Sequence, residues 1–316
     1  MRIFFAGTPD FAVPALEVLT AAQEIDVRGV FSQPSRPRGR GQKKKPPPVA
    51  RTAGELGLRV HEVADINGEE ILSLMARVEP EFLVVVAFGQ KIGRELLKLP
   101  GKGAVNLHAS LLPRYRGPNP IQRAILNGDK ITGLSTMLMD EGWDTGPVLL
   151  QEELEIKNSD TLGSLHDRLA RRGAPLLLET LKKFSRGQIE PQEQAEGGSH
   201  APKLSTREMY LNWNNSACFL ERQVRALNPF PGARVVFKDE EWKIWKAGVE
   251  KDIPGLTPGA IKTTSRELLV QTGRGSLNLL QLQRPGKKPL AADAFLRGIS
   301  LTPGSKLEIR GENNGR

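Results

Sequence analysis

The chain has 316 residues, 39% hydrophobic and 26% charged, which is the composition of a globular protein and excludes wholesale disorder. At roughly 100–200 residues per domain the length predicts about two domains. No stretch approaches the roughly 18 consecutive apolar residues of a membrane span, so we expect no membrane protein. The net charge is +9, and residues 204–316 carry 18 Lys and Arg against 11 Asp and Glu. Such an excess favours phosphate polymers as partners, although a basic surface is more often only solvated.

The cysteine and histidine content limits redox and metal chemistry. A single cysteine, Cys218, excludes an internal disulfide framework and a cysteine-based zinc site. Four scattered histidines leave little for a metal cage, so we expect no metal. The chain starts with a strand-like run and without the long apolar region of a signal peptide, which predicts a cytoplasmic protein.

The first half alternates short β-rich runs with amphipathic stretches. Strands are predicted at 2–6, 26–32, 58–63, 81–88 and 103–108, and helices at 12–20, 49–56, 68–77 and 91–99. This alternation predicts an α/β fold with a doubly wound, mostly parallel sheet. The turn after the first strand contains Gly7 but not the further glycines of a dinucleotide fingerprint, which argues against a hydride-transfer enzyme.

The second half begins with one long helical pattern over 161–184. Residues 187–202, rich in Gln, Glu, Gly and Pro, are typical of an interdomain linker, so we expect domains at 1–189 and 204–316 joined by residues 190–203. After a helical segment at 216–227, five short strand-like runs lie between 233 and 282. They predict a small OB-like β-barrel, a form that carries oligonucleotides but also serves as a plain interaction module.

Two polar clusters hold the densest chemistry. Asn106 and His108 lie two residues apart on a predicted strand, so their side chains leave the same face near the strand's carboxyl end. Open α/β sheets bind ligands at such ends. The second cluster, residues 139–146, follows a strand-like run and contains Asp144. Taken alone, the first cluster could be a pair of satisfied polar groups and the second a tight turn around Gly142.

Residues 33–49 form a strongly basic stretch. They contain six basic residues, five prolines and no acid, in a position where a connection of about 2–6 residues is usual. Long loops inside a compact domain tend to be functional, and Arg and Lys on such a loop suit phosphate and groove contacts. The alternative is a solvated surface loop.

Nearly the whole chain resembles the 10-formyltetrahydrofolate-dependent formyltransferases. The resemblance is most specific in the run NLHASLLPRYRG from Asn106 to Gly117 and in the later Asp144-Thr-Gly motif. It also includes FAGTPDF at 5–11 and Asn228-Pro-Phe-Pro in the second half. The basic loop and the second domain are most similar to the members of this family that act on a transfer RNA.

The resemblance implies a fold, a reaction and a set of site residues. The fold is the Rossmann-like formyltransferase domain, and the formyl donor is 10-formyltetrahydrofolate, with no metal. The catalytic trio falls on Asn106, His108 and Asp144: Asn106 would donate a hydrogen bond to the oxyanion of a tetrahedral intermediate, His108 would carry the proton, and Asp144 would orient the imidazole and stabilise its charge. The folate is placed on Ser110, Leu111, Leu112 and Pro113.

The same resemblance implies that a monomer formylates the α-amine of initiator methionyl-tRNA. The basic loop would contact the acceptor stem through Arg36, Arg38, Arg40, Lys43, Lys44 and Lys45. Two alternatives stay open: formylation of a small amine, such as an amino sugar nucleotide or glycinamide ribotide, and a non-catalytic RNA-binding protein.

The remaining candidates are weaker. His61, His166 and His200 lack partners at ligand spacing and are expected to be structural or solvated. The side chains of Trp213, Trp242 and Trp245 could stack on bases but are more typical of barrel core. Cys218 is predicted to lie in the core.

Overall fold

The computed structural model describes residues 1–38, 43–302 and 305–308. The chain forms two compact units, the first made of 1–120, 131–155 and 166–201 and the second of 121–130, 156–165 and 202–316. Two short segments that precede residue 190, namely 121–130 and 156–165, therefore belong to the second unit, so the boundary between the units is crossed several times along the sequence. Among the described residues, no helix is long and apolar enough to cross a membrane.

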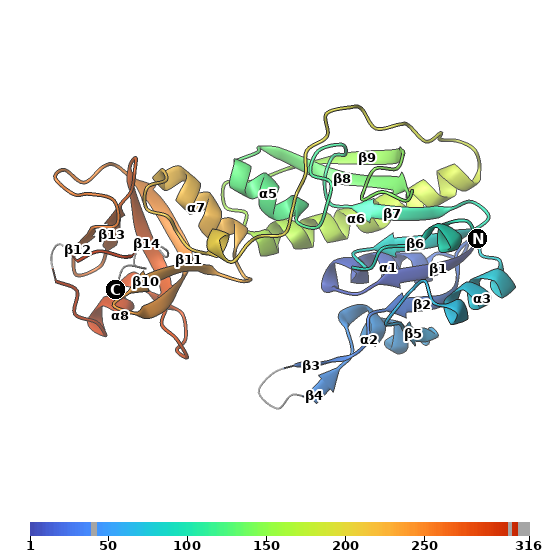
Figure 1. Cartoon of the computed structure of the whole chain (residues 1–316), viewed down its shortest axis with the longest axis horizontal. Helices are drawn as coiled ribbons and strands as arrows, with labels where there is room; N and C mark the ends of the chain where they lie inside the picture. Colours follow the sequence, from blue (N-terminus) through green and yellow to red (C-terminus); the bar gives the residue numbers. More distant parts are fainter. Residues whose placement is uncertain (39–42, 303–304, 309–316) are drawn as a thin grey trace. The chain divides into compact units, whose positions relative to one another are not determined.

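The first unit is built on a seven-stranded sheet of order β5-β2-β1-β6-β7-β8-β9 (Figure 1). The strands are β1 (Arg2–Gly7), β2 (Asp26–Ser32), β5 (Val60–Glu62), β6 (Phe82–Val86), β7 (Ala104–His108), β8 (Ile131–Leu138) and β9 (Val148–Glu155). Neighbours from β5 to β7 are parallel, and β8 and β9 add an antiparallel edge. The predicted doubly wound, mostly parallel sheet is confirmed.

Helices cover both faces of this sheet. They are α1 (Val13–Ala21), α2 (Pro48–Glu55), α3 (Glu69–Val78), α4 (Arg94–Leu97) and α6 (Leu162–Ser185), with a 3₁₀ turn, η1, at Asp10–Ala12. On one face Phe4 and Leu83 form a core with Met75 of α3. On the other, Phe184 of α6 lies 6.1 Å from the ring of Phe82. The burial of alternate residues on opposite faces is why these strands read as nearly continuous apolar runs.

The second unit contains an antiparallel sheet of order β10-β11-β14-β13-β12, with β15 on β14. The strands are β10 (Ala233–Phe237), β11 (Glu240–Glu250), β12 (Ile261–Thr263), β13 (Leu268–Gln271), β14 (Ser276–Gln283) and β15 (Leu290–Ala291). The helical elements are α5 (Pro120–Asn127), η2 (Arg207–Met209), α7 (Ala217–Ala226) and α8 (Ala292–Arg297). Residues Lys306 and Glu308 bridge to Ala260 and Val236, so the last described segment spans the gap between the sheet's two edges.

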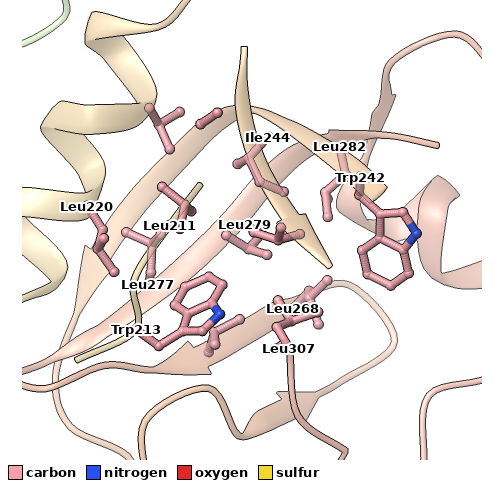
Figure 2. Close-up of a cluster of buried hydrophobic side chains, with 14 of the residues drawn as sticks. Leu211, Trp213, Leu220, Trp242, Ile244, Leu268, Leu277, Leu279, Leu282 and Leu307 are labelled. Atoms are coloured by element: carbon pink, nitrogen blue, oxygen red, sulfur yellow. The ribbon is translucent and has the colours of Figure 1, made fainter. Parts of the chain in front are cut away.

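The core of this unit is centred on two tryptophans. Trp213 and Trp242 are fully buried among leucine side chains of β13 and β14 (Figure 2). This is the barrel-core role expected for them, and it leaves neither indole available to a base. The predicted OB-like barrel is present as a half-barrel.

Residues 33–49 do not form an irregular loop throughout. Strand β3 (Arg36–Arg38) pairs with β4 (Lys43–Lys45) in an antiparallel hairpin, in which Arg36 lies opposite Lys45 and Arg38 opposite Lys43. Arg40 lies outside the described residues. The sequence predicted a loop here. The observed pairing places like charges directly opposite each other, an arrangement that destabilises strand pairing.

Candidate functional site

Asn106 and His108 lie at the carboxyl end of β7, between β6 and β8 in the sheet. Both side chains are buried, with 9% and 7% of their surface exposed. Buried polar groups cost free energy unless they are hydrogen-bonded, so the partners of these two residues matter. The position is the one at which open α/β sheets bind ligands.

Asp144 lies on the loop between β8 and β9. Hydrogen bonds within this loop stabilise its conformation. The Asp140 carboxylate accepts hydrogen bonds from the Gly142 N–H at 2.9 Å and from the Thr145 hydroxyl at 2.8 Å. Asp144 itself adopts the left-handed conformation, with φ of 56°. A Cβ at Gly146 would lie 1.9 Å from the Leu138 carbonyl oxygen, so the Asp-Thr-Gly motif needs glycine at its end.

The three predicted catalytic side chains meet at one point. Asn106 Nδ2 donates to Asp144 Oδ1 over 3.4 Å, and His108 Nδ1 lies 3.6 Å from Asp144 Oδ2. The Gly117 N–H donates to the same Oδ2 at 2.8 Å and fixes the carboxylate. Residues 106 and 144, separated by 38 positions in the sequence, are thus brought into contact.

The two ring nitrogens of His108 both face oxygen acceptors. Nε2 lies 2.9 Å from the carbonyl oxygen of Tyr115, and Nδ1 faces the carboxylate of Asp144. A carbonyl oxygen can only accept, so Nε2 carries a proton in this arrangement. The lone pair of the neutral ring is then on Nδ1, the nitrogen on the side of Asp144.

Gln194 is a residue of this site that the sequence pattern did not reveal. Its Nε2 donates to the carbonyl oxygens of Asp144 at 2.9 Å and Gly146 at 2.7 Å, and its Oε1 accepts from Arg116 at 2.8 Å. The neighbouring Ser199 accepts from the Tyr115 N–H at 2.9 Å. The segment expected to be a linker therefore lies against the loops that hold the trio. No local signal separates Gln194 from the other glutamines of this stretch.

The predicted folate residues form a turn next to His108. Ser110 and Leu112 are buried, whereas Leu111 and Pro113 are half-buried. The Leu112 N–H donates to Ser135 Oγ at 3.0 Å, and its carbonyl oxygen accepts from Gln151 at 2.9 Å. The backbone of Leu112 is thus hydrogen-bonded internally, and Leu111 and Pro113 are the residues of this turn with exposed surface.

The basic hairpin is attached to the sheet through Glu62. Its carboxylate accepts from the Ser35 N–H at 2.9 Å and from the Ser35 hydroxyl at 2.6 Å. The hydroxyl bond, followed by the backbone bond, holds the pKa of Glu62 below its ordinary value. Arg36, Lys44 and Lys45 are exposed. A cationic hairpin that is exposed, and whose start is hydrogen-bonded to β5 of the sheet, is suited to binding a polyanion.

The weaker candidates show structural contacts. Burial lowers the pKa of His61, and the nearby charge of Arg59 adds to the effect. His166 contacts Asp167 at 2.9 Å. His200 Nδ1 lies 2.8 Å from the carbonyl oxygen of Arg116. Across the parts of the chain that the structure describes, no group of three or more His, Cys, Asp or Glu could hold a metal.

The remaining barrel residues differ in their burial. Trp245 is half-buried, and its Nε1 donates to Gln283 at 2.9 Å. The prediction for Cys218 was wrong, since this side chain is exposed. The core face of α7 carries Ala217, Leu220 and Val224 instead, so position 218 lies off that face.

Comparison with known proteins assigns the chain to a family. The model of the formyl transferase family matches residues 1–181, and that of the formyl transferase C-terminal domain matches residues 203–300. The chain belongs to the formyl transferase family. Among its relatives in that family are proteins named methionyl-tRNA formyltransferase from Halothermothrix orenii, 44% identical over 97% of this chain and 100% of the relative, and from Moorella thermoacetica, 44% identical over 97% and 99%.

Solved structures at lower sequence identity share the fold. WlaRD, a sugar 3N-formyl transferase, superposes with a TM-score of 0.66 at 17% identity and covers 91% of this chain and 99% of its own. HypX from Aquifex aeolicus in complex with tetrahydrofolic acid gives 0.62 at 18% identity, covering 96% of this chain and 49% of its own. At these identities the likeness is one of fold.

Proposed function

We propose that this protein transfers a formyl group from 10-formyltetrahydrofolate to the α-amine of initiator methionyl-tRNA, acting as a cytoplasmic monomer. The observation that carries the proposal is the meeting of Asn106, His108 and Asp144 in a chain 44% identical, over nearly its full length, to proteins named for that reaction. All three side chains come from one chain, so no second copy is needed to complete the trio.

The trio supplies what formyl transfer needs. The amine attacks the formyl carbon, a carbon–nitrogen bond forms, and the bond from that carbon to the folate nitrogen breaks. Asn106 donates a hydrogen bond to the formyl oxygen as negative charge develops on it. His108 takes the proton released by the amine and returns it to the leaving folate nitrogen. Asp144 holds the imidazole in place and stabilises its positive charge.

The donor is proposed to bind beside this trio, on the turn of Ser110, Leu111, Leu112 and Pro113. Leu111 and Pro113 offer half-buried apolar surface to a planar ring system. The backbone of Ser110 and Leu112 fixes the turn that carries this surface. The Ser135 hydroxyl donates to the Ser110 carbonyl oxygen at 2.7 Å and accepts from the Leu112 N–H. The residues present fit a folate, and the proposal that this chain takes a folate is supported by a solved structure of the same fold in complex with tetrahydrofolic acid.

The basic hairpin is proposed to hold the acceptor stem of the transfer RNA. Arg36, Lys44 and Lys45 expose cationic side chains, and Arg38, Arg40 and Lys43 complete the six-charge set in sequence. Like charges face each other across the hairpin, so a polyanion that neutralises them relieves a repulsion that the free protein bears.

The alternative of a small amine substrate has one observation in its favour, namely that solved neighbours of the fold include sugar formyl transferases. Those neighbours are only 17–20% identical, whereas the relatives at 44% identity carry the methionyl-tRNA name. A non-catalytic RNA-binding protein would have no need for three converging polar side chains, two of them buried.

The test is a formylation assay of the full chain with a labelled formyl donor. Methionyl-tRNA, an amino sugar nucleotide and glycinamide ribotide are offered separately, and uncharged tRNA is the control for label on RNA. We expect label on methionyl-tRNA alone. Label on a small amine with none on methionyl-tRNA would contradict the proposal, and no label with any acceptor would favour the non-catalytic reading.

A further inference from the structure

A small polar hollow lies in the second unit, and its lining residues include none of the trio. It is bounded by the end of α5, by the segment that follows β9 and by one face of α7, and it is lined by Gly128, Asp129, Lys130, Lys157, Arg222 and Arg225 among others. Its volume is about 50 Å³. One water needs about 10–15 Å³ on the same scale, so the space suits a single tetrahedral oxyanion and excludes a nucleoside. We call it the basic pocket.

The walls of the basic pocket carry an excess of positive charge. Four of its lining residues are cationic, Lys130, Lys157, Arg222 and Arg225, and one is acidic, Asp129. Arg225 is paired with Glu221, so two positive charges remain in excess. Gathering like charges around one concave space is unfavourable unless an anion shares it.

The two arginines are held differently. Arg225 is anchored, because its Nε donates to Glu221 at 2.7 Å and its Nη1 to the carbonyl oxygen of Asp160 at 2.9 Å. Arg222 Nε is buried and, within the described residues, has no hydrogen-bond partner. Because this nitrogen is buried, the pocket can offer a ligand only the terminal nitrogens of the Arg222 guanidinium.

Gly128 is what allows the Arg222 guanidinium to reach this position. A Cβ at Gly128 would lie 2.5 Å from Arg222 Nη1, and the residue has φ of +75°, where glycine is favoured. Lys130 Nζ donates to Asn158 Oδ1 at 3.3 Å, and Lys157 is exposed at the rim. The local backbone therefore makes room for a cation where the net charge is already positive.

We propose that the basic pocket binds one phosphate group and, resting on the proposed function, that this group belongs to the backbone of the bound tRNA. Planar guanidinium donors and ammonium groups are the side chains that recognise phosphate oxygens. Free inorganic phosphate has the same chemistry and is the competing source. The pocket would thus give the second unit a defined contact with the RNA backbone, separate from that of the basic hairpin.

The test uses Lys157→Met and Arg222→Met in the full chain, with Lys262→Met, an exposed lysine of β12, as the matched loss of one charge elsewhere. Affinity for uncharged tRNA is measured over a range of salt concentrations, so the readout does not depend on formylation. We expect each pocket variant to bind at least threefold more weakly and to lower the salt slope by about 0.9. The control should keep the slope, and the turnover of all three at saturating methionyl-tRNA should match the parent.

Two outcomes would overturn the proposal. One is parental affinity and salt slope in both pocket variants. The other combines two results: inorganic phosphate protects the parent but not the variants from thermal unfolding, and tRNA binds the parent and the variants equally well. The pocket would then hold a free oxyanion. Lys157 is exposed, so its variant keeps the test decisive if Arg222→Met folds poorly. Failure of the proposed function would show instead as a parent that does not formylate methionyl-tRNA.

Discussion

The side-chain amide of Gln194 donates a hydrogen bond to the main-chain oxygen of Asp144 at 2.9 Å. The same nitrogen also bonds Gly146, and the amide oxygen accepts from Arg116. One side chain thus ties the loop that carries the carboxylate to the loop that follows His108. Gln194 therefore positions Asp144 without itself touching the reacting atoms.

Replacing Gln194 by Ala should lower kcat for formyl transfer roughly 5- to 30-fold, because a lost hydrogen-bond set of about 1–2 kcal/mol lets the Asp144 loop relax. Steady-state kinetics should show KM for methionyl-tRNA unchanged and the pH dependence of kcat displaced. Gln192→Ala is the matched control, since Gln192 bonds Val148 through its backbone and its side chain donates only a long bond, of 3.4 Å, to the carbonyl oxygen of Glu190. Equal kcat values for the two variants would remove Gln194 from the positioning of Asp144.

The folate assignment predicts a selective effect at Leu111. Leu111→Ala removes half-buried apolar surface from the turn beside His108, so the KM for the formyl donor should rise about threefold to tenfold. Binding of tRNA, measured by filter retention, should stay at the parental level. A weaker tRNA affinity with an unaltered donor KM would mean that the turn holds the other substrate.

The basic hairpin predicts a change in salt dependence. Arg36→Met, Lys44→Met and Lys45→Met combined remove three exposed charges and should lower the salt slope of log affinity for tRNA by about 2.7, at about 0.9 per phosphate contact. Exposed cations elsewhere in the first unit, Arg59, Arg77 and Lys91, provide a triple variant of equal charge as control. The same slope in both triple variants would reduce the hairpin to a solvated surface feature.

Acid should weaken the second unit through Glu208. Burial raises the pKa of this carboxyl, but the hydrogen bonds from Arg123 and Ser205 outweigh it and hold the pKa below its ordinary value of 4.5. A depressed folded pKa gives stability that is present above the unfolded value and is lost as the pH falls through the folded value. The urea midpoint of Glu208→Gln should therefore be lower than that of the parent at pH 7. The two midpoints should approach each other near pH 3, where the parent has lost this contribution. A constant difference at both pH values would contradict this linkage.

The alternation of apolar strands and amphipathic helices predicted most of the first unit because each parallel strand buries both faces and so leaves a continuous apolar run. Strand β9 was missed because it is an edge strand whose exposed positions carry Glu153 and Glu155. The proposed trio could be named from the motifs around Asn106 and Asp144. The bonds of Gln194, by contrast, join positions about 50 and 78 residues apart, and local patterns hold no information on such contacts.

The exposure of Cys218 and the unpaired Nε of Arg222 were equally inaccessible from the sequence. Both depend on the rotation of α7 about its axis, which is decided by what packs beneath it. The helix itself could be predicted at 216–227, but the face that it turns to the core depends on partners in the barrel.

The central claim is that Asn106 and His108 perform the chemistry of formyl transfer and do not bind the tRNA. Single-turnover formylation of methionyl-tRNA by Asn106→Ala and His108→Ala, with tRNA affinity measured on the same samples, tests it most directly. We predict that each rate falls at least 100-fold, about 2.7 kcal/mol of transition-state stabilisation, while the tRNA affinity stays within about twofold of the parent. Near-parental rates in both variants, or a loss of rate matched by an equal loss of tRNA affinity, would contradict the account.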